Sequence, residues 1–273
     1  MKQEGIESTE LNLNNLIDES EFLENPIGIK SPLENGKHYE LFEIFNSVEG
    51  EFPKSGEFVT FVRFPICNYS CSWCDTMKNP ENKPLWFKYE DIKKSVIMSE
   101  ALTFTGGEAS LFLSDMVDII NRLIKDNVYL KYVKVETNGS NLELMDKTFR
   151  HHFEKYFGEE YEEKFILCWS PKLMTKDYFK TAMNTINVFN PRTMVVKIVM
   201  DPNVKDKLQT FIDRFIYIHG QKGKNVFSMM PLSVVSRGNT TGQIQPDSLK
   251  LIKEYTKKGF AVGLRVHEAL RVR

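Results

Sequence analysis

The 273-residue chain lacks any apolar run of about 18 residues, so the sequence predicts no transmembrane helix. It begins Met-Lys-Gln-Glu-Gly, and no apolar region follows these residues, which argues against a signal peptide and for a soluble, cytoplasmic protein. The formal net charge is only −1, so nothing in the overall charge favours binding to a membrane or to nucleic acid. The chain also lacks internal repeats and low-complexity tracts.

Cysteine is scarce, with four residues in the whole chain. Three of them, Cys67, Cys71 and Cys74, lie within eight positions, whereas Cys168 is far away in the sequence. In a long chain expected in the cytosol, such crowding favours a metal or cluster site over a pair of disulfides.

Charge is distributed unevenly along the chain. Residues 1–36 hold eight acidic and two basic side chains, a net charge of −6. We therefore predict an acidic N-terminal extension over residues 1–36 and one folded domain over residues 37–273. The mildly basic remainder suits a small anionic substrate, although solubility explains it equally well.

From residue 38 onward, strand-like and helix-like patterns alternate. The predicted strands are residues 39–45, 58–64, 102–105, 132–136, 165–169, 193–200, 226–229 and 260–266. The predicted helices are residues 89–98, 113–123, 141–157, 204–218 and 246–258. This alternation indicates an α/β fold of right-handed βαβ units. About six units, fewer than the eight of a closed barrel, predict a partial, open TIM-like barrel of parallel strands with flanking helices. Its site should lie at the C-terminal ends of the strands.

The three crowded cysteines have the spacing C-x3-C-x2-C, in a loop directly after a predicted strand. Three thiolates can hold three irons of a 4Fe–4S cluster and leave the fourth iron open to a small molecule. A structural zinc ion would need a fourth ligand, for which only His38 and Cys168 are available, and only if the fold brings one of them close. Three buried cysteines without a ligand role are the plainest alternative.

C-x3-C-x2-C after the first barrel strand resembles the radical S-adenosylmethionine (SAM) superfamily. The resemblance implies that Cys67, Cys71 and Cys74 bind a 4Fe–4S cluster in a radical SAM partial barrel. SAM would then bind the open iron through its amino and carboxylate groups. Its reductive cleavage would yield a 5′-deoxyadenosyl radical that takes hydrogen from the substrate.

Four further segments follow predicted strands and resemble SAM-contacting motifs, the first one a motif of this superfamily and the next two motifs of one family within it. They are Thr105-Gly-Gly-Glu108, Val135-Glu-Thr-Asn-Gly139, Ser170-Pro-Lys172 and Met229-Met-Pro231. The implied SAM contacts are Gly107, Glu108, Thr137, Asn138, Ser170, Pro171, Lys172, Met229, Met230 and Pro231. Taken singly, Gly-Gly-Glu or Asn-Gly is usually a turn, and a pair of methionines is usually core filling.

Within the superfamily, the chain resembles the 7-carboxy-7-deazaguanine synthase family from about residue 40 onward. The more specific marks are Asp75-Thr76 after the third cysteine, Ser47-Val-Glu-Gly-Glu-Phe52, and Arg265-Val-His267. By this resemblance Thr76 binds a magnesium ion. The implied substrate contacts are Val48, Glu49, Gly50, Arg63, Thr105, His267 and Arg273. Phe52 departs from the family pattern, which has glycine there, and could reshape the substrate pocket.

The resemblance implies a carbon–nitrogen lyase of queuosine (7-deazapurine) biosynthesis. It would convert 6-carboxy-5,6,7,8-tetrahydropterin to 7-carboxy-7-deazaguanine with release of ammonia, using the cluster, SAM and Mg²⁺. We further expect an electron donor such as flavodoxin or ferredoxin, a homodimer, and no contact with membrane or nucleic acid. Two alternatives share the cysteine spacing or its crowding: an activase of an anaerobic glycyl-radical enzyme, and a zinc-stapled binding module that is not an enzyme.

Overall fold

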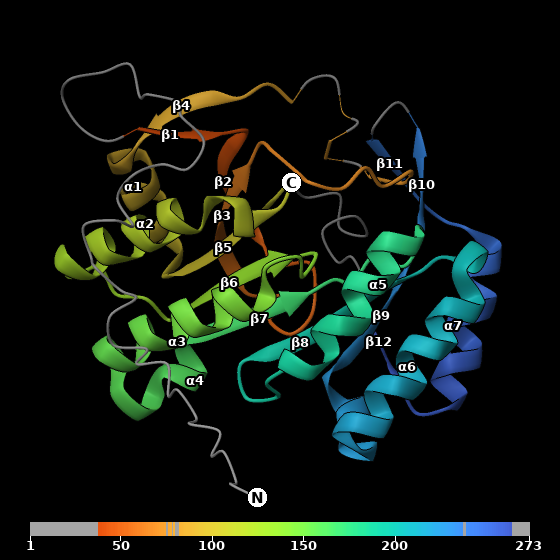
Figure 1. The fold of residues 1–273 in the computed structure, drawn as a ribbon. Helices are drawn as coiled ribbons and strands as arrows, with labels where there is room; N and C mark the ends of the chain where they lie inside the picture. Colours follow the sequence, from red (N-terminus) through yellow and green to blue (C-terminus); the bar gives the residue numbers. More distant parts are fainter. Residues whose placement is uncertain (1–37, 75, 78, 80–81, 237–238, 264–273) are drawn as a thin grey trace, which may run out of the picture. The chain divides into compact units, whose positions relative to one another are not determined.

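The computed structural model describes residues 38–263, apart from residues 75, 78, 80–81 and 237–238 (Figure 1). The predicted extension over residues 1–36 lies outside the described residues and stays a prediction. Within the described part of the chain, no helix is long and apolar enough to cross a membrane.

The centre of the fold is one eight-stranded sheet in the order β12-β9-β8-β7-β6-β5-β3-β2. Its strands are β2 (Glu43–Val48), β3 (Phe58–Phe64), β5 (Ala101–Gly106), β6 (Tyr132–Thr137), β7 (Phe165–Trp169), β8 (Met194–Met200), β9 (Phe227–Pro231) and β12 (Ala261–Val262). Only β2 runs antiparallel to its neighbour, and all other pairings are parallel. Among the described strands, β2 and β12 form the two edges, so the predicted open, mainly parallel α/β fold is confirmed.

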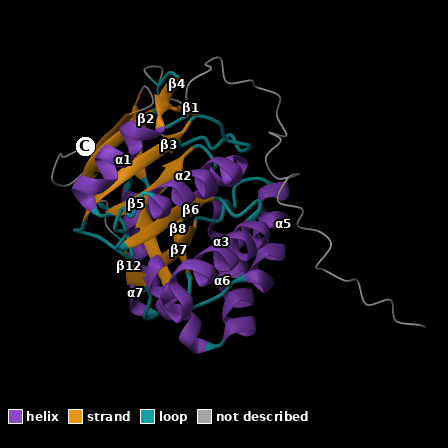
Figure 2. Ribbon diagram, turned by 90° about the vertical axis from the view of Figure 1, so that its left-hand side faces the viewer, coloured by secondary structure: helices purple, strands orange, loops and turns teal. Residues whose placement is uncertain are grey.

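Helices cover the outer face of this sheet (Figure 2). They are α1 (Tyr89–Ser99), α2 (Leu113–Lys125), α3 (Leu142–Phe157), α4 (Tyr161–Lys164), α5 (Lys176–Thr185), α6 (Lys205–His219) and α7 (Pro246–Lys257). The apolar spacing explains their packing, because α2 buries Met116, Ile119, Ile120 and Leu123 on one stripe. Outward strand side chains such as Phe104 and Leu167 complete the same core.

The predicted strand over residues 39–45 is extended as expected but consists of two strands, because the chain divides at Phe42. Strand β1 (His38–Leu41) forms a separate antiparallel ribbon with β4 (Leu85–Lys88), while β2 joins the main sheet. Alternation along one segment cannot show that its two halves pair with different partners. Helix α5 and the hairpin of β10 (Ser233–Ser236) and β11 (Asn239–Ile244) were also not predicted. Of the predicted strand over residues 260–266, only Ala261–Val262 is a strand in the described part.

The strand register determines which side chains point into the open barrel. Thr103 of β5 lies opposite Lys134 of β6, and Glu136 of β6 lies opposite Cys168 of β7. Because side chains alternate between the two faces of a strand, these residues share the inner face. Toward the N-terminal ends of the strands, the inner face is closed by the apolar cluster Val59, Ala101, Tyr132 and Ile166. Polar inner side chains therefore lie toward the C-terminal ends, where the site was predicted.

Candidate active site

The three crowded cysteines lie on the loop that follows β3. All three carry free thiols, with Cys71 buried and the other two half-buried. The backbone N–H of Tyr69 donates to Cys67 Sγ at 3.4 Å, and that of Met77 donates to Cys74 Sγ at 3.2 Å. Burial raises the pKa of the Cys67 thiol, and the Tyr69 N–H opposes this rise. Backbone donors directed at sulfur favour the thiolate form that ligation requires.

Gly107 lets the Gly-Gly-Glu segment approach the start of the cysteine loop. The N–H of Gly107 donates to Phe64 O at 2.9 Å, and the N–H of Glu108 donates to Ile66 O at 2.7 Å. A Cβ at Gly107 would overlap the Ile66 carbonyl and come within 2.9 Å of the Cys67 nitrogen. Two backbones pack here without side chains between them, which only glycine allows.

We expect Gly107→Ala to lower iron incorporation several-fold. The added methyl group must push the Ile66–Cys67 backbone away, which displaces the first cysteine from its partners. The measurement is iron per chain after anaerobic reconstitution, with folding checked by circular dichroism. Gly158→Ala is the control for backbone strain without a clash, because a Cβ at Gly158 meets nothing within 4 Å, whereas its φ of +57° and ψ of −133° strain any residue other than glycine. Equal iron in both variants would contradict the packing role.

Glu108 joins the Gly-Gly-Glu segment to the Thr-Asn-Gly turn after β6. The carboxylate is fully buried and accepts from Thr137 Oγ1 at 2.5 Å and from the Asn138 N–H at 2.6 Å. Asn138 Nδ2 donates in turn to Asn68 Oδ1 of the cysteine loop at 2.8 Å. The structure thus brings three separately predicted segments into one hydrogen-bonded frame, here called the loop frame.

Helix α5 adds a contact to the loop frame that sequence reasoning missed. The Tyr178 ring stacks on Tyr69 of the cysteine loop, with ring centroids 3.8 Å apart. The Tyr178 hydroxyl accepts from the Ser70 N–H at 3.1 Å. Thr175 caps the helix by accepting from the Tyr178 N–H, which was the one local signal of a helix start.

The Ser-Pro-Lys segment after β7 reaches the cysteine loop from the other side. Lys172 Nζ donates to Ser170 Oγ at 2.9 Å and lies 5.1 Å from the ring centroid of Trp73. Trp73 stands between the second and third cysteines, so Lys172 is held beside the cysteine loop by a cation–π contact. Pro171, which lies between Ser170 and Lys172 in the chain, is buried.

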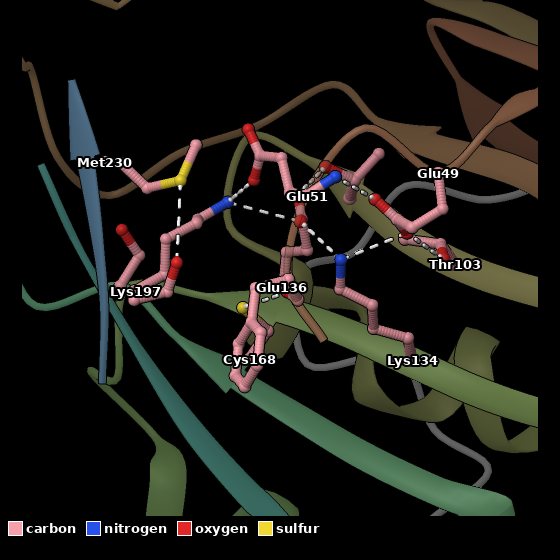
Figure 3. Close-up of polar contacts among 12 residues, drawn as sticks. Glu49, Glu51, Thr103, Lys134, Glu136, Cys168, Lys197 and Met230 are labelled. Carbon is pink, nitrogen blue, oxygen red and sulfur yellow. Dashed lines mark hydrogen bonds and ion pairs between the residues drawn. The ribbon is translucent and has the colours of Figure 1, made fainter. Parts of the chain in front are cut away.

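The two methionines of β9 point to opposite faces of the sheet. Met229 is fully buried in the core between sheet and helices. Met230 lies on the inner face, where its sulfur accepts from the Ser228 hydroxyl at 3.8 Å (Figure 3). Met229 therefore cannot reach the barrel interior from its place in the core, whereas Met230 and the buried Pro231 after it border that interior.

Arg63 and Thr76, predicted for substrate and magnesium, lie together at the end of β3. Arg63 Nη1 donates to Thr76 Oγ1 at 3.2 Å, and Arg63 Nε pairs with Glu43 Oε1 at 2.8 Å. Asp75, His267 and Arg273, which were predicted from the resemblance, lie outside the described residues.

The inner face of the barrel holds a chain of alternating charges, here called the charged ladder: Glu49, Lys134, Glu136, Lys197 and Glu51 (Figure 3). Lys134 Nζ lies 3.0 Å from Glu49 Oε2 and 3.2 Å from Glu136 Oε1. Lys197 Nζ lies 3.2 Å from Glu136 Oε1 and also pairs with Glu51 Oε2. The ladder has three carboxylates against two ammonium groups and is largely shielded from water.

Two threonines of β5 extend the ladder toward the predicted substrate contacts. Thr103 Oγ1 donates to Glu49 Oε2 at 3.1 Å, and Thr105 Oγ1 donates to Glu136 Oε2 at 2.8 Å. Thr105 and Glu49 were predicted as substrate contacts, but Lys134, Glu136, Lys197 and Glu51 were given no role. The local signals were the pair Lys134-x-Glu136 and Lys197, which are charged residues inside otherwise apolar strands, whereas Glu51 carried no such signal.

The pKa values of two carboxylates of the ladder, Glu136 and Glu49, are shifted in opposite directions. Burial would raise the pKa of Glu136, but Lys197 and Lys134 outweigh it and hold that pKa well below its usual range. Burial raises the pKa of Glu49, and Lys134 only partly opposes the rise. Glu136 contacts both lysines, which explains the difference.

The depressed pKa of Glu136 predicts a pH dependence of stability. A carboxyl whose pKa is lower in the folded state stabilises the fold above its ordinary value of 4.5 and loses this contribution as pH falls toward the folded value. Urea unfolding should therefore show Glu136→Gln less stable than wild type at pH 7, with the gap narrowing below pH 4.5. Glu143→Gln, at an exposed ion pair with Lys147, should show no comparable gap at any pH. A gap for Glu136→Gln that stays constant down to acid pH would contradict the assignment.

The cysteine loop fits the cluster that its spacing predicts. A 4Fe–4S cluster takes one thiolate on each of three irons, so the sulfurs need not converge on one point. A structural zinc ion would require its ligands around a single centre. Among the residues that the structure describes, no three His, Cys, Asp or Glu side chains converge in that way. The three free thiols, two of which accept from backbone N–H groups, form a donor set compatible with the cluster that their spacing predicts.

Comparison with known proteins places the chain in a family. No model of a known protein family matches it. The 7-carboxy-7-deazaguanine synthase of Thermoplasma acidophilum is 31% identical over 151 residues, which cover 51% of this chain and 68% of the relative. The synthase of Clostridium acetobutylicum is 32% identical over 38% of this chain and 47% of its own length. The synthase of Bacteroides thetaiotaomicron is 38% identical over 36% of this chain and 50% of its own length.

The chain thus spans about half the length of several of these relatives. The crystal structure of QueE from Escherichia coli matches with a TM-score of 0.54 at 16% identity, over 84% of this chain and 95% of that one, which supports the fold. With the Thermoplasma relative covered over more than two thirds of its length, the chain belongs to the 7-carboxy-7-deazaguanine synthase family.

Proposed function

We propose that this protein is a radical SAM lyase that converts 6-carboxy-5,6,7,8-tetrahydropterin to 7-carboxy-7-deazaguanine and ammonia. The observation that carries the proposal is the loop frame, in which the cysteine loop is bonded to the Gly-Gly-Glu and Thr-Asn-Gly segments. The frame stands at the C-terminal ends of parallel strands, where α/β folds of this kind bind their ligands. The family relatives carry the same activity in their names.

In this proposal Cys67, Cys71 and Cys74 hold the 4Fe–4S cluster, which together with SAM supplies hydrogen-atom abstraction. Ser170 and Lys172 border the cysteine loop and would bind SAM there. The other proposed SAM contacts are Gly107, Glu108, Thr137, Asn138, Pro171, Met230 and Pro231. The Glu108 carboxylate is already bonded to Thr137 and Asn138, so its contribution would be to shape the turn that SAM meets.

Arg63 and Thr76 provide the end of the site that would receive the substrate carboxylate. A guanidinium suits a carboxylate through charge-assisted hydrogen bonds, and a threonine hydroxyl can share a magnesium ion with it. Val48, Glu49, Gly50 and Thr105 would contact the pterin from the inner face. His267 and Arg273 remain proposed contacts that lie outside the described residues.

Thr76→Val should raise the Mg²⁺ concentration needed for half-maximal activity by about tenfold or more, because a magnesium ion cannot use a methyl group as ligand. Thr76→Ser keeps the hydroxyl and should stay close to wild type. The measurement is activity across a magnesium titration. An unchanged magnesium requirement in Thr76→Val would remove Thr76 from the proposed metal site.

The proposal is tested by anaerobic reconstitution with iron and sulfide, followed by SAM, magnesium, a reductant and the carboxypterin. We expect a brown protein that absorbs near ~400 nm and forms a deazaguanine of the expected mass with one ammonia. A protein that cleaves SAM but forms no deazaguanine would refute the substrate while keeping the superfamily. A colourless protein that binds zinc would refute both.

We also propose that a flavodoxin or ferredoxin reduces the cluster and that the protein is a homodimer, as the resemblance implies. Reduction assays with each donor and light scattering of the purified protein test these two points. Co-purification with a large glycyl-radical enzyme would instead favour the activase alternative.

A further inference from the structure

The turn of residues 48–52, which resembles the family's substrate-binding turn, is attached to the far side of the barrel by its two glutamates. It follows β2, at one edge of the sheet. The Glu49 carboxylate lies 3.0 Å from Lys134 Nζ of β6. The Glu51 carboxylate pairs with Lys197 of β8, near the opposite edge (Figure 3). One buried and one partly buried ion pair thus hold five residues of backbone in one position.

Two backbone contacts complete this attachment. The Glu51 N–H donates to Glu49 Oε1 at 3.2 Å, so the carboxylate held by Lys134 also fixes the amide two residues later. The Phe52 carbonyl accepts from the Cys168 thiol of β7 at 4.0 Å. Gly50, between the two glutamates, contributes no side chain. The turn therefore takes its shape from the inner face of the barrel.

Glu136 makes the two ion pairs a single unit. Its Oε1 atom lies 3.2 Å from both Lys134 Nζ and Lys197 Nζ. Each lysine is therefore held between two carboxylates, one from the sheet and one from the turn. A lysine with one partner keeps much rotational freedom, but one placed between two buried partners has a single preferred position.

We propose that Lys197, acting with Lys134 through Glu136, is a positioning residue that sets the conformation of the turn 48–52. This inference deepens the proposed function, since it assumes that the turn binds the pterin. Lys197 acts through Glu51 and does not itself contact the substrate. The loop frame is bonded through other residues, so loss of Lys197 should loosen the turn and leave the frame intact.

The first test is hydrogen exchange in the protein without ligands. In Lys197→Met the Glu51 amide should exchange at least about tenfold faster, because residue 51 loses its own anchor to β8 and only the Glu49 end of the turn stays paired, with Lys134. The Glu108 amide, in the loop frame, should be unchanged. Lys197→Arg keeps the charge and should restore slow exchange, and Lys147→Met, at an exposed ion pair, is the matched control. Unchanged exchange at Glu51 in a folded Lys197→Met protein overturns the proposal.

The second test is equilibrium binding of the carboxypterin to the reconstituted protein. Lys197→Met and Glu51→Gln should each weaken binding about tenfold or more, and the double variant should be no weaker than the worse single one, because both remove the same pair. Iron content and SAM binding should stay at wild-type values in all three. Additive losses in the double variant would mean that Lys197 contacts the substrate directly, which overturns the positioning role.

The outcomes of the two tests distinguish a failure of the proposed function from a failure of the positioning role. If the wild-type protein binds no carboxypterin, the proposed substrate is wrong, while faster exchange at Glu51 in Lys197→Met still establishes the positioning role. If exchange is unchanged while the pterin binds the wild type tightly, the proposed function stands and the positioning role does not.

Discussion

Cys71→Ala is expected to yield a folded protein that holds no stable cluster and has no detectable synthase activity. Each of three irons takes one thiolate, so the remaining two cysteines cannot replace the missing ligand. Cys71 is the most buried of the three, and alanine fills most of its space, so folding should lose only about 1 kcal/mol. Iron per chain, absorbance near ~400 nm and thermal unfolding measure the three parts of this prediction.

Cys168→Ala is the matched control, since it removes the one cysteine outside the loop. Cys168 is fully buried on β7, and burial raises the pKa of its thiol to about 11, so it stays protonated at neutral pH. A protonated thiol is a poor metal ligand. Cys168→Ala should keep its iron. If it loses iron as Cys71→Ala does, or if Cys71→Ala keeps its iron, the ligand assignment is wrong.

Lys134→Met is expected to lower the free energy of unfolding by about 3–5 kcal/mol, because it leaves the buried Glu49 carboxylate without a cation and leaves Glu136 with Lys197 alone. Lys134 is fully buried between Glu49 and Glu136, and methionine matches its length but not its charge. In a domain of this size, the loss should lower the unfolding midpoint by about 10 °C. Urea unfolding and a thermal scan measure both quantities.

Adding Glu49→Gln to Lys134→Met should recover part of this loss, since it removes the buried carboxylate that has lost its cation. The glutamine keeps a hydrogen-bonding group beside Thr103. Lys147→Met, whose partner Glu143 is exposed, should cost less than about 0.5 kcal/mol. A Lys134→Met protein as stable as wild type would mean that Lys134 does not form stabilising ion pairs with Glu49 and Glu136 in the folded protein.

Much of the fold and part of the site could be predicted because they depend on local patterns. Apolar runs such as residues 102–105 and 165–169 correctly predicted the buried strands β5 and β7. The rule that parallel strands present their C-terminal ends together then placed Gly107, Asn138 and Ser170 near one another before any contact was known. Gly107 and Asn138 do lie together in the loop frame, and the Ser170 N–H donates to Thr137 O at 2.7 Å beside it, whereas their roles as ligands remain proposals.

Contacts between distant segments could not be predicted. Lys134 and Glu49 lie 85 positions apart, and the local pattern around either residue does not predict that the two form an ion pair. Alternation shows that Met229 and Met230 point to opposite faces, but only the packing of α6 and α7 decides which face is the core. The same limit explains Tyr178, whose helix was not predicted, and β1, whose partner β4 lies beyond β2, β3 and the cysteine loop in the sequence.

The sequence by itself determined the chemistry that is available: three thiols at cluster spacing, glycines and polar turns after strands, and charged residues inside apolar strands. These are properties of spacing and residue type, which do not depend on distant neighbours. Only the tertiary structure decided that three of those charged residues form one ladder with Glu49 and Glu51 of the turn 48–52. The physical reason is register, because a side chain's inner or outer face and its partner across the sheet are set by strand pairing, and strand pairing is a property of the whole fold.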